Sequence, residues 1–211
     1  MIKVEEVKHP LISHKLTILR DKNTKPTEFR EVVEELALLL LFRATQNLEV
    51  VEVEVETPLE KAKGALVKED IVIIPILRAG TGMKNPLLKI MPDASVYHLG
   101  IYRNEETLEA EEYYSKLPKD LSESVVFILD PMFATGSTFK YALDLIIKRN
   151  PKKVIYLSIV SSPQAIENLK NYPYDFEMYT ASIDRDLNEN GYILPGLGDA
   201  GDRIYGTYPR K

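Results

Sequence analysis

Stretches that are apolar on every side alternate with amphipathic stretches along the chain, which predicts strands alternating with helices. Three short apolar runs, 71–77, 125–129 and 154–161, have the pattern of strands covered by helices on both faces of a sheet. The second run is followed by apolar positions at helical spacing, namely Phe139, Ala142, Leu143 and Ile146. Strands and helices in this order predict an α/β fold, with a parallel sheet flanked by helices.

The first third of the chain predicts a long helix and an alternating strand. Thr27 is expected to cap a helix whose apolar positions are Phe29, Val32, Val33, Leu36 and Leu40. Residues 36–42 are apolar almost all round, so this helix lies either in the core or in a subunit interface. Residues 50–57 alternate valine with glutamate, which predicts a half-buried strand with a solvated glutamate face. Inside 71–77, Pro75 predicts that the strand ends or bulges.

Shorter elements and one long polar connection follow. We expect helices at 83–91, with Pro86 near its start, and at 163–171, and strands at 96–103 and 176–183. Residues 104–120 are strongly polar, so they form either a flap over a site or ordinary surface. The tail from Asp184 is rich in glycine and aspartate and has no clear period.

Three of the expected strands end in residues suited to ligand binding. Arg78 follows the first apolar run, Arg103 closes the strand at 96–103, and Asp130 follows the run 125–129. Ligands of parallel α/β sheets bind beyond the carboxyl ends of the strands, and there these side chains would meet. A functional site at this edge is therefore expected, although arginines in salt bridges would look the same in the sequence.

The loop after Asp130 has the composition of a phosphate site. Residues 134–138 are small or hydroxylated and lead into a helix, where unpaired backbone amides favour an anion. The lysine of an ATP-binding or GTP-binding P-loop is absent. Taken alone, the loop is equally an ordinary strand-to-helix turn, because serine, threonine and glycine are common in turns.

Composition narrows the classes of function. The 211 residues are expected to form a single domain, 1–211, and the net charge of −5 favours neither nucleic acid nor an anionic membrane as a partner. The chain has no cysteine, which excludes thiolate nucleophiles, and its three histidines do not have metal-ligand spacing. The longest apolar run, 36–42, is too short to cross a bilayer, and the N-terminus lacks the pattern of a signal peptide. We therefore expect a cytoplasmic protein.

Two motifs resemble one known family. Residues 130–138, DPMFATGST, resemble the motif that binds 5-phospho-α-D-ribose 1-diphosphate (PRPP) in type I phosphoribosyltransferases, and the Asp-Pro-Met start is similar to that of uracil phosphoribosyltransferases. Residues 191–203, GYILPGLGDAGDR, resemble the uracil-binding loop of the same family. Further matches, from His9-Pro10-Leu11 to Glu111-Glu112-Tyr113-Tyr114, extend the resemblance over essentially the whole chain.

The resemblance implies a fold and a reaction. The fold would be that of a type I phosphoribosyltransferase, with a hood formed by about 1–26 and 184–211 and with a polar flap. The reaction would convert uracil and PRPP to UMP and pyrophosphate in pyrimidine salvage, with Mg²⁺ carried by PRPP rather than by a protein site. Members of this family are oligomeric, so a homodimer or homotetramer is expected, and some members are activated by GTP.

The resemblance also assigns roles to residues. Asp130 and Arg103 would be catalytic, with Asp130 under the ribose, and Asp199 would lie nearest to PRPP and its metal. The implied PRPP contacts are Arg78, Ala79, Gly80, Arg103, Asp130, Pro131, Met132, Phe133, Ala134, Thr135, Gly136, Ser137, Thr138 and Asp199. The implied uracil contacts, made mainly by main-chain groups, are Tyr192, Ile193, Gly198, Asp199 and Ala200.

Some positions depart from the family pattern, and two other interpretations stay open. Ser137 stands where the family more often has glycine, Phe133 where it often has leucine, and Asn85-Pro86 where Asp-Gly is more usual. The last departure leaves the geometry after the pyrophosphate loop open. One alternative is a PRPP-binding regulator that binds RNA, although the acidic chain lacks the basic face this needs. The other is the same reaction with a different base.

Overall fold

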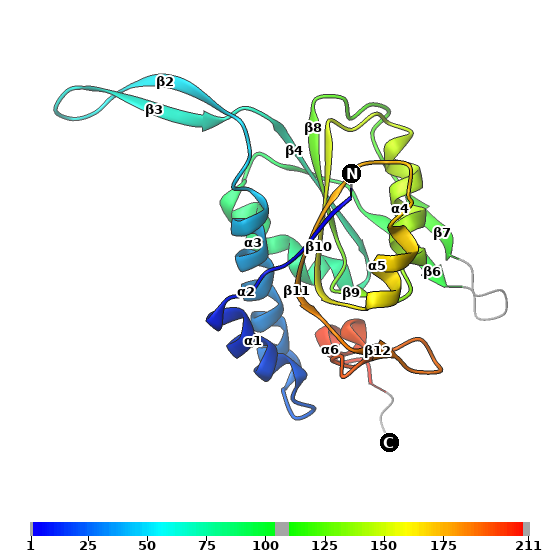
Figure 1. The fold of residues 1–211 in the computed structure, drawn as a ribbon. Helices are drawn as coiled ribbons and strands as arrows, with labels where there is room; N and C mark the ends of the chain where they lie inside the picture. Colours follow the sequence, from blue (N-terminus) through cyan, green and yellow to red (C-terminus); the bar gives the residue numbers. More distant parts are fainter. Residues whose placement is uncertain (1, 104–109, 209–211) are drawn as a thin grey trace.

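A computed structural model describes residues 2–103 and 110–208 of the chain. A central sheet runs through the molecule, and its neighbouring strands are parallel except for the last pair (Figure 1). From one edge to the other the order is β1 (Lys3–Glu6), β11 (Glu177–Ile183), β10 (Lys153–Ser161), β8 (Ser124–Leu129), β4 (Asp70–Leu77), β6 (Leu99–Arg103) and β7 (Ala110–Ser115). The mainly parallel α/β fold predicted from the alternation of elements is confirmed.

Helices cover both faces of this sheet (Figure 1). The helices α1 (Pro10–Arg20), α2 (Pro26–Ala44) and α3 (Lys84–Ile90) lie on one side, and α4 (Ser137–Ile147) and α5 (Pro163–Leu169) lie on the other. Successive residues of β8 point to opposite faces, so Phe127 joins the cluster under α2 whereas Val126 and Ile128 join the cluster under α4. This explains why the run 125–129 is apolar without interruption.

Strand β4 continues through Pro75, so the prediction that the strand ends or bulges there is wrong. Pro75 is paired with Leu129 of β8, and the strand goes on to Leu77. On its other side β4 pairs first with the short strand β5 (Ser95–Val96) and then, from Ile76 onward, with β6. Proline has no amide to donate, and here it falls in the gap between these two partners. The same change of partner splits the strand expected at 96–103 into β5 and β6.

Helix α2 begins one residue earlier than the predicted cap, and the apolar residues of its second half are partly buried and partly exposed. It begins at Pro26 with Lys25 as the N-cap residue, so Thr27 is inside the helix and is not the cap. Proline suits the first turn, because its missing amide would have no partner there. Leu36, Ala37, Leu40 and Leu41 are buried in the core, whereas Leu38 and Phe42 are exposed, Phe42 by 73%. The helix therefore serves the core and also leaves an apolar strip uncovered.

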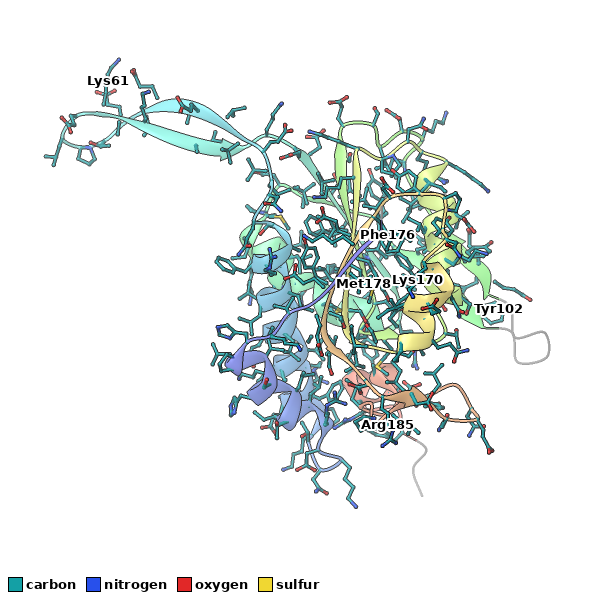
Figure 2. All side chains as sticks on the ribbon, in the orientation of Figure 1. Lys61, Tyr102, Lys170, Phe176, Met178 and Arg185 are labelled. Carbon is teal, nitrogen blue, oxygen red and sulfur yellow. The ribbon has the colours of Figure 1, made fainter. Side chains whose placement is uncertain are left out.

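The alternating stretch at 50–57 is a strand, but it is not half-buried as predicted. Strand β2 (Val50–Glu56) pairs only with β3 (Lys61–Val67), and this hairpin extends away from the body of the molecule (Figure 1). Lys61 lies near its far end (Figure 2). Val51, Val53 and Val55 share one face of the hairpin with Leu66, whereas Val50 lies on the glutamate face. No described residue outside the hairpin packs against the Val51 face in the core clusters.

Helix α1 and the C-terminal tail meet beyond the carboxyl ends of the central strands. The tail forms the short strands β12 (Asp186–Leu187) and β13 (Ile193–Leu194) and the helix α6 (Ala200–Tyr205), which lie beside α1 in this region (Figure 1). Arg20 at the end of α1 is joined to Asp184 by two hydrogen bonds of 2.5 and 2.6 Å. We propose that these two segments are the hood, as the resemblance implies.

The polar connection at 104–120 falls partly outside the described residues. Its second half supplies β7, which pairs antiparallel with β6, and Tyr102 donates a hydrogen bond to Glu111 across this pair. Tyr102 lies at the edge of the molecule beside these strands (Figure 2). The described part of this connection therefore belongs to an antiparallel pair at the sheet edge, and the predicted flap at 104–109 lies outside the described residues.

Candidate active site

A cavity of about 440 Å³ opens at the carboxyl edge of the sheet, between the strand ends and the tail. Ten of the residues expected in a site contribute to its wall. They are Arg78, Ala79, Asp130, Met132, Ala134, Tyr192, Ile193, Gly198, Asp199 and Ala200. The cavity therefore joins the loop after Asp130 to the tail loop, two segments that are about 60 residues apart in the sequence.

Asp130 stands at the end of β8, where the apolar strand stops. Its amide donates to Leu157 of β10 at 3.2 Å, which holds the backbone in line with the sheet. Its carboxylate accepts one bond of 3.3 Å, from the amide of Met132. Burial raises the pKa of the Asp130 carboxyl to about 7, and the Met132 amide only partly opposes this shift. The position therefore favours a proton or a cationic partner on this carboxyl.

The loop at 134–138 leads into α4, which begins at Ser137. Gly136 has a φ of 85°, a left-handed conformation that a larger side chain would adopt only with strain, and it is the residue before the helix. Thr135 and Ser137 share a hydroxyl–hydroxyl bond of 2.9 Å. The Thr135 carbonyl is fixed by Asn168 of α5, 3.1 Å away. Only Ala134 of this loop lines the cavity, and Thr135, Gly136, Ser137 and Thr138 continue from it toward α4.

Two residues of the motif at 130–138, Phe133 and Pro131, are buried and stabilise the loop rather than facing the cavity. Phe133 is 2% exposed and its ring packs against Phe139 and Tyr156, with ring centroids 5.6 and 5.2 Å away. Pro131 is buried, and its carbonyl accepts the amides of Ile159 and Val160. Neither residue lines the cavity, although both were expected to contact PRPP. They anchor the loop to β10 and to the core below it.

On the neighbouring strand, β4 leads into the 3₁₀ helix η1 (Ala79–Met83). The peptide bond between Leu77 and Arg78 is cis. Gly80 is buried and does not line the cavity, because η1 packs directly on the end of β8. A Cβ at Gly80 would lie only 2.2 Å from the Leu129 carbonyl oxygen, so no other residue fits. Gly80 thus lets the Arg78 loop lie beside Asp130.

Arg78 is exposed and reaches across to the tail. Its guanidinium lies 3.1 Å from the Asp202 carboxylate of α6. The Arg78 carbonyl also accepts a bond of 3.1 Å from the Tyr205 hydroxyl. Hydrogen bonds from Thr207 and from Arg78 hold the pKa of the Asp202 carboxyl below its usual value. An anionic ligand in the cavity would compete with Asp202 for this arginine.

Arg103 ends β6, the strand next to β4, and its backbone pairs with Ala110. Strands β8, β4 and β6 are neighbours in this order. The residues at their carboxyl ends, Asp130, Arg78 and Arg103, therefore lie along one edge of the sheet, as the sequence predicts. The side chain of Arg103 lies outside the part of the chain that the structure describes, so its expected role stays a prediction.

Backbone geometry and hydrogen bonds define the shape of the tail loop. Gly196 and Gly198 have φ values of 59° and 78°, and the Leu194–Pro195 peptide bond is cis. Asp199 caps α6 by accepting the Asp202 amide at 2.8 Å. Tyr192 is 46% exposed, and its amide donates to Asn188 at 2.8 Å. The glycines let the backbone run close to whatever occupies the cavity.

Three cavity residues were not expected from the sequence, namely Asn190, Gly191 and Gly201. Asn190 and Gly191 form the turn between β12 and β13. A Cβ at Gly201 would lie 3.4 Å from a guanidinium nitrogen of Arg78, so this glycine lets α6 approach that arginine. The Asn-Gly pair is a turn signal, but only the fold reveals that the turn reaches the cavity.

The fold and the cavity define an enzyme of the phosphoribosyltransferase class, a group of glycosyltransferases. A match to the family described as uracil phosphoribosyltransferase covers residues 6–207. The chain belongs to the uracil phosphoribosyltransferase family.

Individual relatives agree with this assignment. A uracil phosphoribosyltransferase of Thermosipho melanesiensis is 51% identical over 98% of this chain and 100% of its own length, and one of Thermosipho africanus is 52% identical over the same shares. A solved structure of a protein from Aquifex aeolicus is 39% identical and superposes with a TM-score of 0.92, over 98% of this chain and 100% of that chain. The match therefore extends over the site segments as well as the core.

Within the described residues, no helix is both long enough and apolar enough to span a bilayer.

Proposed function

We propose that this chain transfers the phosphoribosyl group of PRPP to uracil and releases UMP and pyrophosphate. One observation carries the proposal: the loop that resembles a PRPP motif and the loop that resembles a uracil-binding segment form the wall of a single cavity. A two-substrate transfer needs both binding regions within reach of each other. The family membership supports the same reaction.

The chemistry requires electrostatic stabilisation rather than a nucleophile. As the bond between C1 of ribose and the pyrophosphate oxygen breaks, positive charge grows on the ribose and negative charge on the leaving group. We assign Asp130 to the positive side, where its carboxylate accepts bonds from the ribose hydroxyls and stabilises the cation-like transition state. A half-buried carboxylate suits this role, because its charge acts at short range in a medium of low dielectric constant.

We assign the negative side to the neighbouring loops. Arg78, freed from Asp202, would bind pyrophosphate oxygens with charge-assisted bonds, together with the amide of Ala79, which also lines the cavity. Arg103 would join them from the end of β6. The turn at 134–138 would hold the 5′-phosphate with its hydroxyls and with the unpaired amides at the start of α4.

Mg²⁺ fits the oxygen donors of this cavity. Asp130 and Asp199 both line it, and carboxylate oxygens are the ligands that Mg²⁺ prefers. Among the described residues there is no group of three or more histidine, cysteine, aspartate or glutamate residues that could hold a metal. We therefore propose that the diphosphate of PRPP supplies most of the ligands, with Asp199 nearest. When bound, the ion neutralises charge that develops on the leaving group.

Uracil would be recognised by the main chain of the tail loop. Its imide edge offers two carbonyl acceptors and N–H donors, which backbone amides and carbonyls from Ile193 to Ala200 can match. Cytosine has an amino group where uracil has a carbonyl, so a site with a fixed amide there should reject it. Competition with cytosine, hypoxanthine and guanine tests this choice of base.

The direct test is synthesis of UMP. Purified protein with Mg²⁺, PRPP and labelled uracil should give labelled UMP and one equivalent of pyrophosphate. Absence of product over a range of pH and temperature would refute the proposal. The acidic chain argues against an RNA-binding regulator, and an RNA-shift assay with salt titration would reveal one.

We also propose that the chain forms a homodimer or homotetramer in the cytoplasm. The exposed apolar residues Leu38, Phe42 and Ile90 and the uncovered valine face of the hairpin support association. Activation by GTP, implied by the resemblance for some family members, is tested by measuring UMP synthesis with and without GTP.

A further inference from the structure

Arg203 is a buried arginine whose cationic group binds backbone carbonyls. It is 5% exposed, and no ion pair with a carboxylate is recorded for it in the described part of the chain. Its guanidinium instead donates to the carbonyls of Leu19 at 2.6 Å, Leu197 at 2.7 Å and Asp21 at 2.5 Å. It also lies 4.3 Å from the centre of the Phe29 ring. Burying a charged guanidinium costs solvation free energy, and these hydrogen bonds offset that cost.

One of these contacts sets the direction of a peptide group in the cavity wall. In a planar trans peptide the carbonyl and the following amide point to opposite sides. Because the Leu197 carbonyl points to Arg203, the amide of Gly198 points away from Arg203. Gly198 lines the cavity, whereas Arg203 does not. A Cβ at Gly198 would lie 3.7 Å from Cδ of Arg203, so the arginine is directly behind this residue.

The Gly198 amide is free to donate. Among the described residues, no hydrogen bond engages it. The two preceding peptides are fixed as well, since the Gly196 carbonyl accepts from Arg20 at 2.8 Å and the Gly196 amide donates to Asp184 at 2.9 Å. The loop therefore has a held backbone and one unused donor on the side of the cavity.

We infer that Arg203 is a positioning residue for the base, which turns the Leu197–Gly198 peptide so that the Gly198 amide donates to a uracil carbonyl. The inference rests on the proposed function and deepens it. Arg203 does not line the cavity and holds the loop expected to bind the base, so its removal should affect uracil far more than PRPP. Arg78 and Asp130, on the PRPP side of the cavity, follow β4 and β8, and the Arg203 guanidinium bonds instead to Leu19, Asp21 and Leu197.

The experiment compares steady-state constants of Arg203→Met and the wild type. Methionine keeps much of the length and removes all donors. We expect KM for uracil to rise about tenfold, the usual effect of losing one hydrogen bond, and KM for PRPP to change less than about twofold. The preference for uracil over cytosine should fall as well. Arg30→Met is the matched control: Arg30 also donates to a backbone carbonyl of α6, that of Ile204 at 2.8 Å, but not to the loop. Its constants should match the wild type.

A second variant covers the case in which Arg203→Met does not fold. Arg203→Lys keeps the charge but can reach fewer carbonyls, so it should fold and raise KM for uracil about threefold with KM for PRPP unchanged. Equal rises in both constants, or no rise in either, for the folded variant would overturn the inference. A wild-type protein that makes no UMP would instead refute the proposed function.

Discussion

The surroundings of Asp130 disfavour the ionised form of its carboxyl. The apolar strand β8 ends directly before this residue, and one long bond from the Met132 amide is all that the described protein offers its carboxylate. Burial raises its pKa to about 7, so near neutral pH the carboxyl is only partly ionised. A cationic ribose or Mg²⁺ would favour the ionised form, so catalysis and folding make opposite demands on this residue.

Replacing Asp130 with asparagine should therefore slow the enzyme and stabilise the fold. We expect kcat to fall by ~10²-fold or more, as when one electrostatic group of an active site is lost. The folded pKa lies above the unfolded value of 3.8, so the folded state loses stability as pH rises between these values. The melting temperature of Asp130→Asn should exceed that of the wild type at pH 8, and the difference should shrink at pH 5.

The control for this experiment is Asp93→Asn, because Asp93 is exposed and far from the cavity wall. It should change neither kcat nor melting temperature. A near-normal rate in Asp130→Asn would remove Asp130 from the proposed role. A lower melting temperature at pH 8 would show that the carboxylate stabilises the empty fold.

Arg78→Ala should weaken PRPP binding without much loss of stability. The arginine is 56% exposed and its pair with Asp202 is partly solvated, so the pair contributes at most about 1 kcal/mol to folding. Losing a charge-assisted contact to pyrophosphate should raise KM for PRPP about tenfold or more. Steady-state kinetics with PRPP varied would measure this.

Arg43→Ala is a contrasting variant. Arg43 forms a two-bond pair with Glu5, at 2.6 and 2.8 Å, away from the cavity. It should lower the melting temperature and leave KM for PRPP unchanged. An unchanged KM in Arg78→Ala would identify Arg78 as a structural partner of Asp202 only.

At the scale of elements, sequence patterns identified strands and helices better than their surroundings. The buried runs at 125–129 and 154–161 were predicted correctly, because a strand covered on both faces has no polar positions to spare. The strand at 50–57 was expected to be half-buried, but alternation reveals two faces and not what covers them. The prediction that the strand ends or bulges at Pro75 was wrong because the sequence does not show which strands pair with β4 on either side of this residue.

The hairpin β2–β3 is the element whose role is least explained within one chain. Glu54 pairs with Lys61 at 2.6 Å on its polar face, whereas Val51 and Leu66 are paired on the other face and are both exposed. If that face associates with a second copy, Val51→Lys combined with Leu66→Lys should reduce the mass of the particle in solution, as measured by light scattering. Glu54→Gln combined with Lys61→Gln, on the polar face, should leave the mass unchanged. An unchanged mass in the first variant would exclude this face from the interface.

At the scale of the whole molecule, the cavity depends on contacts between distant parts of the chain. Asp184 is buried and accepts from Arg20, Ser182 and the Gly196 amide. Burial alone would raise the pKa of the Asp184 carboxyl, but these bonds hold it below its usual value. Its stabilising effect is therefore present above the unfolded pKa and is lost as pH falls through the lower, folded pKa.

Asp184→Asn should destabilise the protein by ~2–4 kcal/mol at pH 7, because it leaves Arg20 without its counter-charge in a partly buried place. Denaturant unfolding at pH 7 and below pH 4 would measure this, and the loss should shrink at the lower pH. Lys63→Gln, in an exposed pair with Glu52, should have almost no effect. Equal unfolding midpoints for Asp184→Asn and the wild type would show that the pair is not a structural link.

The sequence revealed more of the PRPP side of the cavity than of the base side. Asp130 and Arg78 follow buried strands, so the rule for parallel sheets was enough to bring them together. The tail has no period, and its strands of two residues could not be expected from it. The resemblance supplied the tail contacts, but it did not reveal the roles of Arg203 and Asp184, which depend on residues more than 160 positions away.

The contacts of Arg203 and Arg20 join the start of the chain to its last thirty or so residues. During synthesis, strand β8 and the loop after Asp130 are made well before the tail. A chain cut short before the tail would therefore possess a PRPP motif without a base pocket, and a chain missing its first helix would lose the carbonyls and the guanidinium that hold the tail loop. Full activity therefore requires that the segment around Arg20 and the tail have both been made and are in contact.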